Sequence, residues 1–136
     1  MKKQELLERF GKIYINFVYD SALHTFKSLI EQKARAPALL PLMKNLQNFD
    51  DEQIHIIKEL VMEILGTSIH YTLFMLEEYQ DEMQLTMQDD TGASHSLIEI
   101  SDGLCGELYT EDGWIEKYTK YPDWQQTIAN KKRNNL

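Results

Sequence analysis

The stretch from Phe49 to Tyr79 restricts the fold most, because it combines a specific helix start signal with the longest apolar periodicity in the chain. Asp50 can accept a hydrogen bond from the Gln53 amide while the Gln53 side chain reaches back to the Asp50 amide. Phe49 and Ile54 occupy the two positions of a hydrophobic staple. We therefore predict one long helix from Phe49 to Tyr79.

One face of this helix has side chains at steps of three and four residues, the spacing of a helix that packs against a core. The row consists of Ile54, Ile57, Val61, Leu65, Ser68, Thr72 and Leu76, and it is widened by Leu60, Ile64, Tyr71 and Phe74. We expect Val61 and Leu65 to lie in the core.

A second long helix is predicted from Gln4 to about Ala34. Its apolar row is Leu7, Phe10, Tyr14, Val18, Ala22, Phe26 and Leu29 or Ile30. Asp20 and Ser21 could instead start a new helix, and either form is expected to bury the same face. Pro37 and Pro41 exclude an uninterrupted helix beyond this point, so a short helix beginning near Pro41 is expected to link the two long helices as an antiparallel hairpin.

After Tyr79 the apolar period changes from helical to alternating, which is typical of strands. Met83, Leu85 and Met87 alternate with polar residues, residues 89–93 form a turn signal, and a partner strand over 96–100 follows. Gly106 to Tyr109 and Trp114 to Tyr118 flank another turn signal at 111–113, which favours a second hairpin. The alternative is a helix capped by Thr110 that carries the aromatic residues after it, with Trp114, Ile115, Tyr118 and Tyr121 on one side.

Together these patterns predict a single α+β domain over residues 1–136. An antiparallel two-helix hairpin with a short linking helix, residues 1–81, packs on a small antiparallel β-sheet of about four strands in an acidic, β-rich half, residues 82–121. Residues 122–136 are predicted as a short helix from Pro122 to about Asn130 and a disordered tail from Lys131 to Leu136, which has few apolar residues.

The formal net charge of −8 is concentrated in one part of the chain. Residues 77–123 carry thirteen acidic side chains against only Lys117 and Lys120, whereas residues 1–76 carry nine of each sign. Such an acidic surface disfavours a nucleic-acid backbone as ligand. No apolar run is long enough to span a membrane, so we expect no membrane partner. The first residues are not signal-like and Cys105 is the single cysteine, which favours a cytoplasmic location.

Two groups of side chains invite a catalytic interpretation. Glu52 and His55 form a Glu-x-x-His pair of the type that binds iron or manganese in helix bundles, and Glu59 lies one turn further on. A second such pair is missing from the sequence, so a solvated polar face explains these residues better and we predict no metal or cofactor. Cys105, between Gly103 and Gly106, is interpreted as a small, partly buried side chain rather than a nucleophile.

Aromatic residues interleave with carboxylates between Glu99 and Trp124. Such aromatic residues are frequent binding hot spots, and clustered carboxylates speed the encounter with a basic partner. The candidate partner-binding residues are Glu107, Tyr109, Glu111, Asp112, Trp114, Glu116 and Tyr118. The structural alternative is that the aromatic residues fill the core and the carboxylates only keep the outer face soluble.

The sequence therefore favours a small acidic, non-enzymatic binding protein that docks on a basic protein surface. An immunity or inhibitor protein that neutralises a toxin is its most specific form. One alternative is a metal-dependent enzyme or sensor that uses the Glu and His residues of the central helix. Another is a small-ligand module with a pocket between sheet and helices, lined by Tyr71, Phe74, Ile98 and Trp114.

Overall fold

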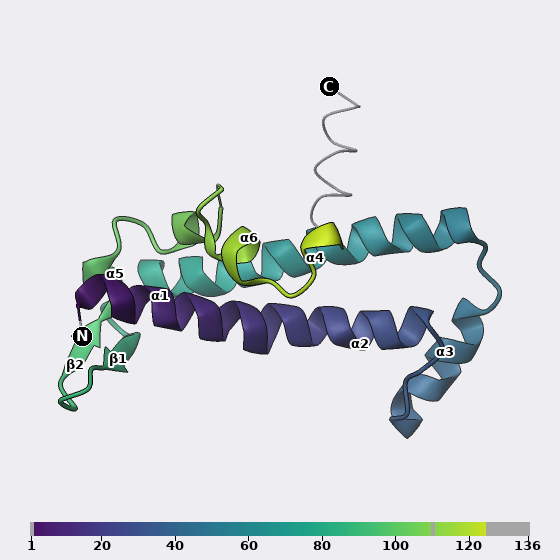
Figure 1. Ribbon diagram of the computed structural model, residues 1–136, viewed down its shortest axis with the longest axis horizontal. Helices are drawn as coiled ribbons and strands as arrows, with labels where there is room; N and C mark the ends of the chain where they lie inside the picture. Colours follow the sequence, from purple (N-terminus) through teal and green to yellow (C-terminus); the bar gives the residue numbers. More distant parts are fainter. Residues whose placement is uncertain (1, 110, 125–136) are drawn as a thin grey trace.

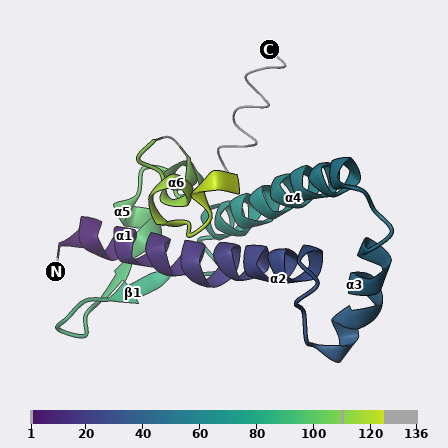
Figure 2. The same ribbon diagram turned by 45° about the vertical axis from the view of Figure 1, so that its right-hand side comes forward.

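The computed structural model describes residues 2–109 and 111–124, and most of this chain is helical (Figure 1). The first long segment consists of α1 (Lys3–Tyr14), a π-helix (Ile15–Tyr19) and α2 (Asp20–Ile30), and α4 (Asp51–Glu78) lies beside it and antiparallel to it. A 3-10 turn (Pro37–Leu39) and α3 (Leu40–Leu46) link them at one end (Figure 2). The predicted helical hairpin with a short linking helix is thus present.

The predicted capping box at the start of α4 is confirmed. The Gln53 amide donates to Asp50 Oδ1 at 2.8 Å, and the Asp50 amide donates to Gln53 Oε1 at 2.9 Å. The buried face of α4 differs from the predicted row, because Met62, Ile69 and Leu73 are its buried residues. The placement of Val61 and Leu65 in the core is therefore wrong, since both are partly exposed, although Leu65 packs against the core.

The π-helix changes which face of the first segment is buried. Its wider turn shifts the helical register, so Tyr19 and Leu23 replace Val18 and Ala22 in the buried row. The expected buried row is therefore wrong at Val18 and Ala22, whereas Phe26 and Leu29 are buried as predicted. The shift also turns the carboxylate of Asp20 inward, where it is almost completely buried.

The sheet is smaller than predicted. It has two strands, β1 (Thr86–Gln88) and β2 (Ser94–Ser96), paired antiparallel with Thr86 opposite Ser96. The prediction of about four strands is wrong. The strand expected over 96–100 ends at once, because the Ser96 hydroxyl accepts from the Glu99 amide and caps α5 (Leu97–Ile100), which buries Leu97.

The second predicted hairpin is also wrong, as is the description of residues 82–121 as β-rich. In place of the two strands of that hairpin, the structure has a 3-10 helix (Cys105–Leu108) and α6 (Trp114–Tyr118). The helical alternative was the better one, although Gly113 and not Thr110 occupies the N-cap. Residues 122–124 are helical, and the remainder of the predicted C-terminal helix and tail lies outside the described residues.

The packing of Trp114 explains why this segment is helical. Its side chain is completely buried and lies against the backbone of α1 at Gly11, where an added Cβ would stand 2.4 Å from the indole ring. A helical turn places Tyr118 on the same side, and its hydroxyl donates to Glu8 of α1. Lys117 Nζ also lies 2.8 Å from Glu8 Oε2, so α6 is fixed to α1 by packing and by charge.

Hydrogen bonds to Asp20 fix the chain that follows α6 to the first long segment. The buried carboxylate of Asp20 accepts from Thr119 Oγ1 at 2.6 Å and from the Lys120 amide at 3.0 Å. The two long segments are joined in turn by Tyr14, whose hydroxyl donates to the Ile69 carbonyl at 2.7 Å. Each of these bonds satisfies a polar group that packing removes from water.

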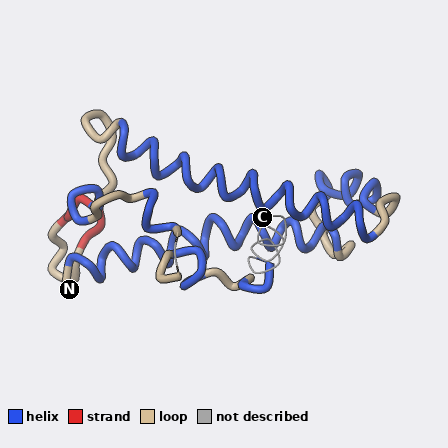
Figure 3. The backbone as a smooth tube through the Cα atoms, turned by 90° about the horizontal axis from the view of Figure 1, so that it is seen from above, coloured by secondary structure: helices blue, strands red, loops and turns tan. Residues whose placement is uncertain are grey.

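The main core lies at the end of the molecule that holds the sheet, where α1, the C-terminal half of α4 and residues 97–118 meet (Figure 3). Its buried residues are Leu6, Leu7, Tyr14, Ile15, Tyr19, Leu23, Met62, Ile69, Leu73, Leu97, Leu104, Leu108 and Trp114. Beyond Asp20 and Leu23, the buried residues of α2 and α3 are Phe26, Leu29 and Leu46, towards the opposite end. The N-terminal half of α4 therefore has little cover.

Candidate protein-docking surface

Three of the seven predicted partner-binding residues are used within the fold. Trp114 is in the core, so it is not offered to a partner in this structure. Tyr118 is partly buried and bonded to Glu8, and Glu107 accepts from the Ser101 hydroxyl at 2.9 Å. For these residues the structural alternative, a role in packing, describes the observed contacts.

The other four, Tyr109, Glu111, Asp112 and Glu116, are exposed. Of these, Tyr109 leads to a surface on α4, because its hydroxyl lies 2.8 Å from His70 Nδ1 and its ring centroid lies 5.8 Å from that of His70. Burial raises the pKa of the Tyr109 phenol, so this hydroxyl stays protonated at neutral pH. Glu111 and Asp112 follow Tyr109 closely in the sequence, and both are exposed.

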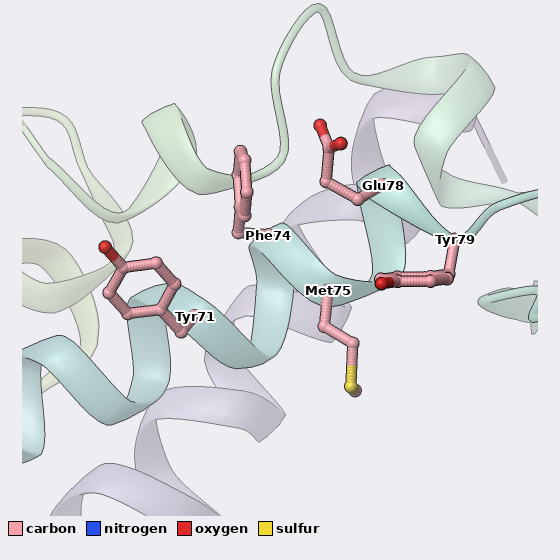
Figure 4. Close-up of a pocket in the computed structure, with 5 residues that line it drawn as sticks. All are labelled: Tyr71, Phe74, Met75, Glu78 and Tyr79. Carbon is pink, nitrogen blue, oxygen red and sulfur yellow. The ribbon is translucent and has the colours of Figure 1, made fainter.

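His70 and Tyr109 border a group of exposed residues that we call the α4 aromatic surface, formed by Tyr71, Phe74, Met75, Glu78 and Tyr79 (Figure 4). Tyr71 is 60% exposed and Tyr79 54% exposed. The rings of Tyr71 and Phe74 meet edge to face at 6.1 Å, and Phe74 stacks on His70 at 6.3 Å. These ring contacts restrict the side chains while leaving much of their area open to a partner.

The five residues line an open hollow of about 540 Å³. Four of them come from α4 and Tyr79 is its C-cap, and Figure 4 shows Phe74 and Glu78 on one side of the helix with Met75 on the other. A small-molecule pocket normally encloses most of its ligand, whereas one helix provides only one wall. The predicted pocket is not assembled here, since Trp114 is buried and Ile98 packs on the core, away from this hollow.

Both the backbone and the side chains make this end of α4 electrostatically negative. The unpaired carbonyls of the last turn carry partial negative charge. The same turn contains Glu77 and Glu78 and no basic side chain. Asp81 and Glu82 follow directly and are exposed. An arrangement that is unfavourable for an isolated helix is suited to holding a cationic group.

Cys105 lies behind this surface and is built into the fold. Its amide donates to Glu77 Oε1 at 2.8 Å, and its thiol lies 3.6 Å from the His70 carbonyl. Burial and the neighbouring Glu77 carboxylate raise the pKa of the thiol to about 11. The thiol is therefore protonated at neutral pH, which is unsuitable for a nucleophile and supports the structural interpretation.

The central-helix residues considered for a metal are paired or exposed. His55 Nε2 lies 3.1 Å from Glu59 Oε1, and the side chain of Glu52 faces solvent. Over residues 2–109 and 111–124, no three His, Cys, Asp or Glu side chains come together in a way that could hold a metal ion. The arrangement in this part of the chain is thus a charged helix surface.

No known family matches this chain. Searches of curated proteins and of solved structures likewise found no significant match. Within the part of the chain that the structure describes, no helix has the length and apolar character needed to cross a membrane. The surface itself must therefore carry the functional interpretation.

Sequence reasoning placed Tyr71 and Phe74 on the wide apolar row of α4 but did not identify the exposed side of that row. A usable signal was present, because the apolar residues of α4 extend around more of the helix than one antiparallel neighbour can cover. Met75 and Tyr79 extend the same side. Such an excess indicates a second partner for the helix.

Proposed function

We propose that this chain is a non-enzymatic binding protein that docks on a basic protein surface through the α4 aromatic surface and the carboxylates around it. The observation that carries the proposal is the group of exposed, mutually contacting rings at the acidic end of α4. Tyr71, Phe74 and Tyr79 provide the apolar and aromatic area typical of interface hot spots.

The charge around these rings favours a basic partner over a neutral one. Glu78 lines the hollow itself, Asp81 and Glu82 continue the chain, and Glu111 and Asp112 lie next to Tyr109 in sequence. Carboxylates at the rim of an interface act mainly on the rate of encounter, whereas central aromatic residues act on dissociation. The two groups of residues can therefore be tested separately.

The shape of the hollow supports a protein partner over a small ligand. A convex helix with exposed rings offers area but no enclosure, and a second protein surface supplies the missing walls. Inhibition of a basic toxin is the most specific form of the proposal. It fits the formal net charge of −8.

The test is affinity capture from lysate of the source cells with immobilised wild-type chain and matched variants, followed by mass spectrometry. We expect the wild-type chain to retain a basic protein that is eluted by moderate salt. The Tyr71→Ala/Phe74→Ala variant should lose that protein. Phe17→Ala, which removes a ring that is 77% exposed on the other long segment, should retain it.

The carboxylates are tested with the captured partner by kinetics. Reversing Glu111 and Asp112 to Lys should slow association and flatten its dependence on salt, with little change in stability. Capture of the same proteins by wild type and by Tyr71→Ala/Phe74→Ala would refute the assignment of the surface. A captured partner that is acidic would refute the charge argument.

A further inference from the structure

The exposed apolar row on α4 continues beyond the aromatic surface. Ile56, Leu60 and Ile64 lie one turn apart on the N-terminal half of the helix, and Leu60 and Ile64 are 61% and 59% exposed. Successive steps of four and seven residues lead from them to Tyr71 and Met75. With a rise of about 1.5 Å per residue, the row from Ile56 to Met75 is about 28 Å long.

This row is on the side of α4 that faces away from the first long segment. Leu60 and Met62 are two positions apart and so point in roughly opposite directions, and Met62 is buried in the core. Figures 1 and 2 show α2 running along one side of this half of α4, with the opposite side uncovered by any described element. A strip of this length, one helix wide, fits a second helix better than a loop or a sheet.

The charges beside the row identify the occupant. α4 carries six carboxylates and a single basic residue, Lys58, whose ammonium group lies 4.3 Å from the ring centroid of Trp124 on the far side of the helix. Glu52 and Glu78 lie one turn from Ile56 and Phe74, at the two ends of the row. The row thus has carboxylates at both ends and Glu63 beside it, and the exposed polar residues Thr67 and Ser68 lie between its two apolar parts.

A second copy of this chain does not complement that pattern. Two copies paired along the row would bring acidic helices together, and each chain has a net charge of −8. Like charges placed across an interface cost free energy and suppress that pairing. A helix with Lys or Arg beside its apolar face meets the same row with opposite charge.

We infer that the partner docks as a basic amphipathic helix lying along α4 from Ile56 to Met75, with apolar side chains at steps of three and four residues. This inference rests on the proposed function and specifies its partner. Ile56, Leu60 and Ile64 bind the apolar face of one end of the partner helix. The α4 aromatic surface binds its other end.

The test uses a 21-residue amidated peptide built from Leu and Lys with the leucines on one helical face. A peptide of the same composition with the leucines dispersed, and an analogue with Glu in place of Lys, serve as controls. Binding is followed by titration calorimetry, and helix formation by circular dichroism. We expect one basic peptide with its leucines on one face to bind per chain, with a gain in helicity, and neither control peptide to bind.

Leu60→Gln/Ile64→Gln should weaken binding of the basic peptide at least tenfold, because both side chains lie mid-row. Ile13→Gln, an exposed apolar position on α1, is the matched control and should bind as wild type does. The inference of a partner helix along α4 would be overturned if Leu60→Gln/Ile64→Gln bound the basic peptide as wild type does while Tyr71→Ala/Phe74→Ala lost it. The proposed function would then still stand.

Two other outcomes separate the alternatives. If the basic peptide with its leucines on one face does not bind at low salt, the inference fails, and the proposed function is decided by the capture experiment alone. Sedimentation that detects a dimer of wild-type chain, dispersed by Leu60→Gln/Ile64→Gln, would overturn the inference in favour of a second copy.

Discussion

Replacing Gly11 by Ala should destabilise the protein, although the same change inside a helix normally stabilises it. Gly11 lies within α1, where Ala is favoured over Gly by about 1 kcal/mol. Its Cβ would stand 2.4 Å from two carbons of the Trp114 indole and 2.5 Å from its nitrogen. Ordinary contacts between carbon atoms are about 3.5 to 4.0 Å, so the ring would have to move by about 1 Å or more.

The size of the effect follows from what Trp114 can do. The ring is completely buried, so it can strain its surroundings at a cost of up to about 3 kcal/mol or leave the core at a cost of about 3 to 5 kcal/mol. The gain in helix propensity offsets about 1 kcal/mol of either cost. Since the protein adopts the less costly of the two, we expect Gly11→Ala to lower the free energy of unfolding by up to about 2 kcal/mol.

Gly66→Ala is the matched control, since Gly66 is in the interior of α4 and an added Cβ meets nothing within 4 Å. It should raise the free energy of unfolding by about 0.5 to 1 kcal/mol. Urea denaturation followed by circular dichroism at 222 nm gives both values. In a Trp114→Leu background, Gly11→Ala should lose most of its cost, because the clashing ring is gone.

An equal effect of Gly11→Ala in the wild-type and Trp114→Leu backgrounds would refute this reasoning. A stabilising Gly11→Ala would also refute it, because it would mean that α6 does not place the indole on α1. Whether Gly11→Ala lowers or raises the free energy of unfolding thus tests whether Trp114–Tyr118 forms a helix rather than part of the predicted hairpin.

Three further predictions concern buried and titrating groups. Asp20→Ala should cost about 2 kcal/mol in urea denaturation and speed hydrogen exchange at the Lys120 amide, since it removes the acceptor of that bond. Burial raises the pKa of Glu8, but hydrogen bonds from α6 outweigh this effect and hold the pKa below its ordinary value of 4.5. The stability that this carboxylate contributes is therefore present above about pH 4.5 and is lost as the pH falls further. Glu8→Gln should accordingly flatten the acid limb of a plot of stability against pH. Cys105, with a thiol pKa of about 11, should react with iodoacetamide at pH 7.5 far more slowly than a free cysteine, and Glu77→Gln should speed the reaction, as measured by mass spectrometry.

The sequence predicted the long helices well because their signals are local. The capping box at Asp50 involves residues three positions apart, and Pro37 and Pro41 interrupt any helix for steric reasons. The turn at residues 89–93 is equally local, with Asp89 Oδ1 accepting from two amides and Gly92 at φ +87°. The short hairpin around it was predictable on these grounds.

The rest depends on contacts between distant residues. Residues 114–118 fit one strand of a second hairpin in the sequence, but they form α6, whose Trp114 fills the space over Gly11. The exposed side of α4 was equally unpredictable in detail, because Leu60 and Met62 are both apolar and only the packing of α1 determines which is buried. Tyr109 was predicted as a partner-binding residue, but its contact with His70, 39 residues away, could not be predicted from the sequence.

The π-helix at Ile15–Tyr19 sets the orientation of α2 relative to α1. Forcing all five residues into an ordinary α-helix would rotate α2 by about 100° relative to α1, so that Asp20 would turn away from Thr119 and Leu23 would leave the core. Removing one residue instead would restore an α-helical turn and keep α2 in its orientation, because the wider turn holds one residue more. The loss of one residue within residues 15–19 should therefore be tolerated among relatives of this chain, as it is in loops such as residues 31–36.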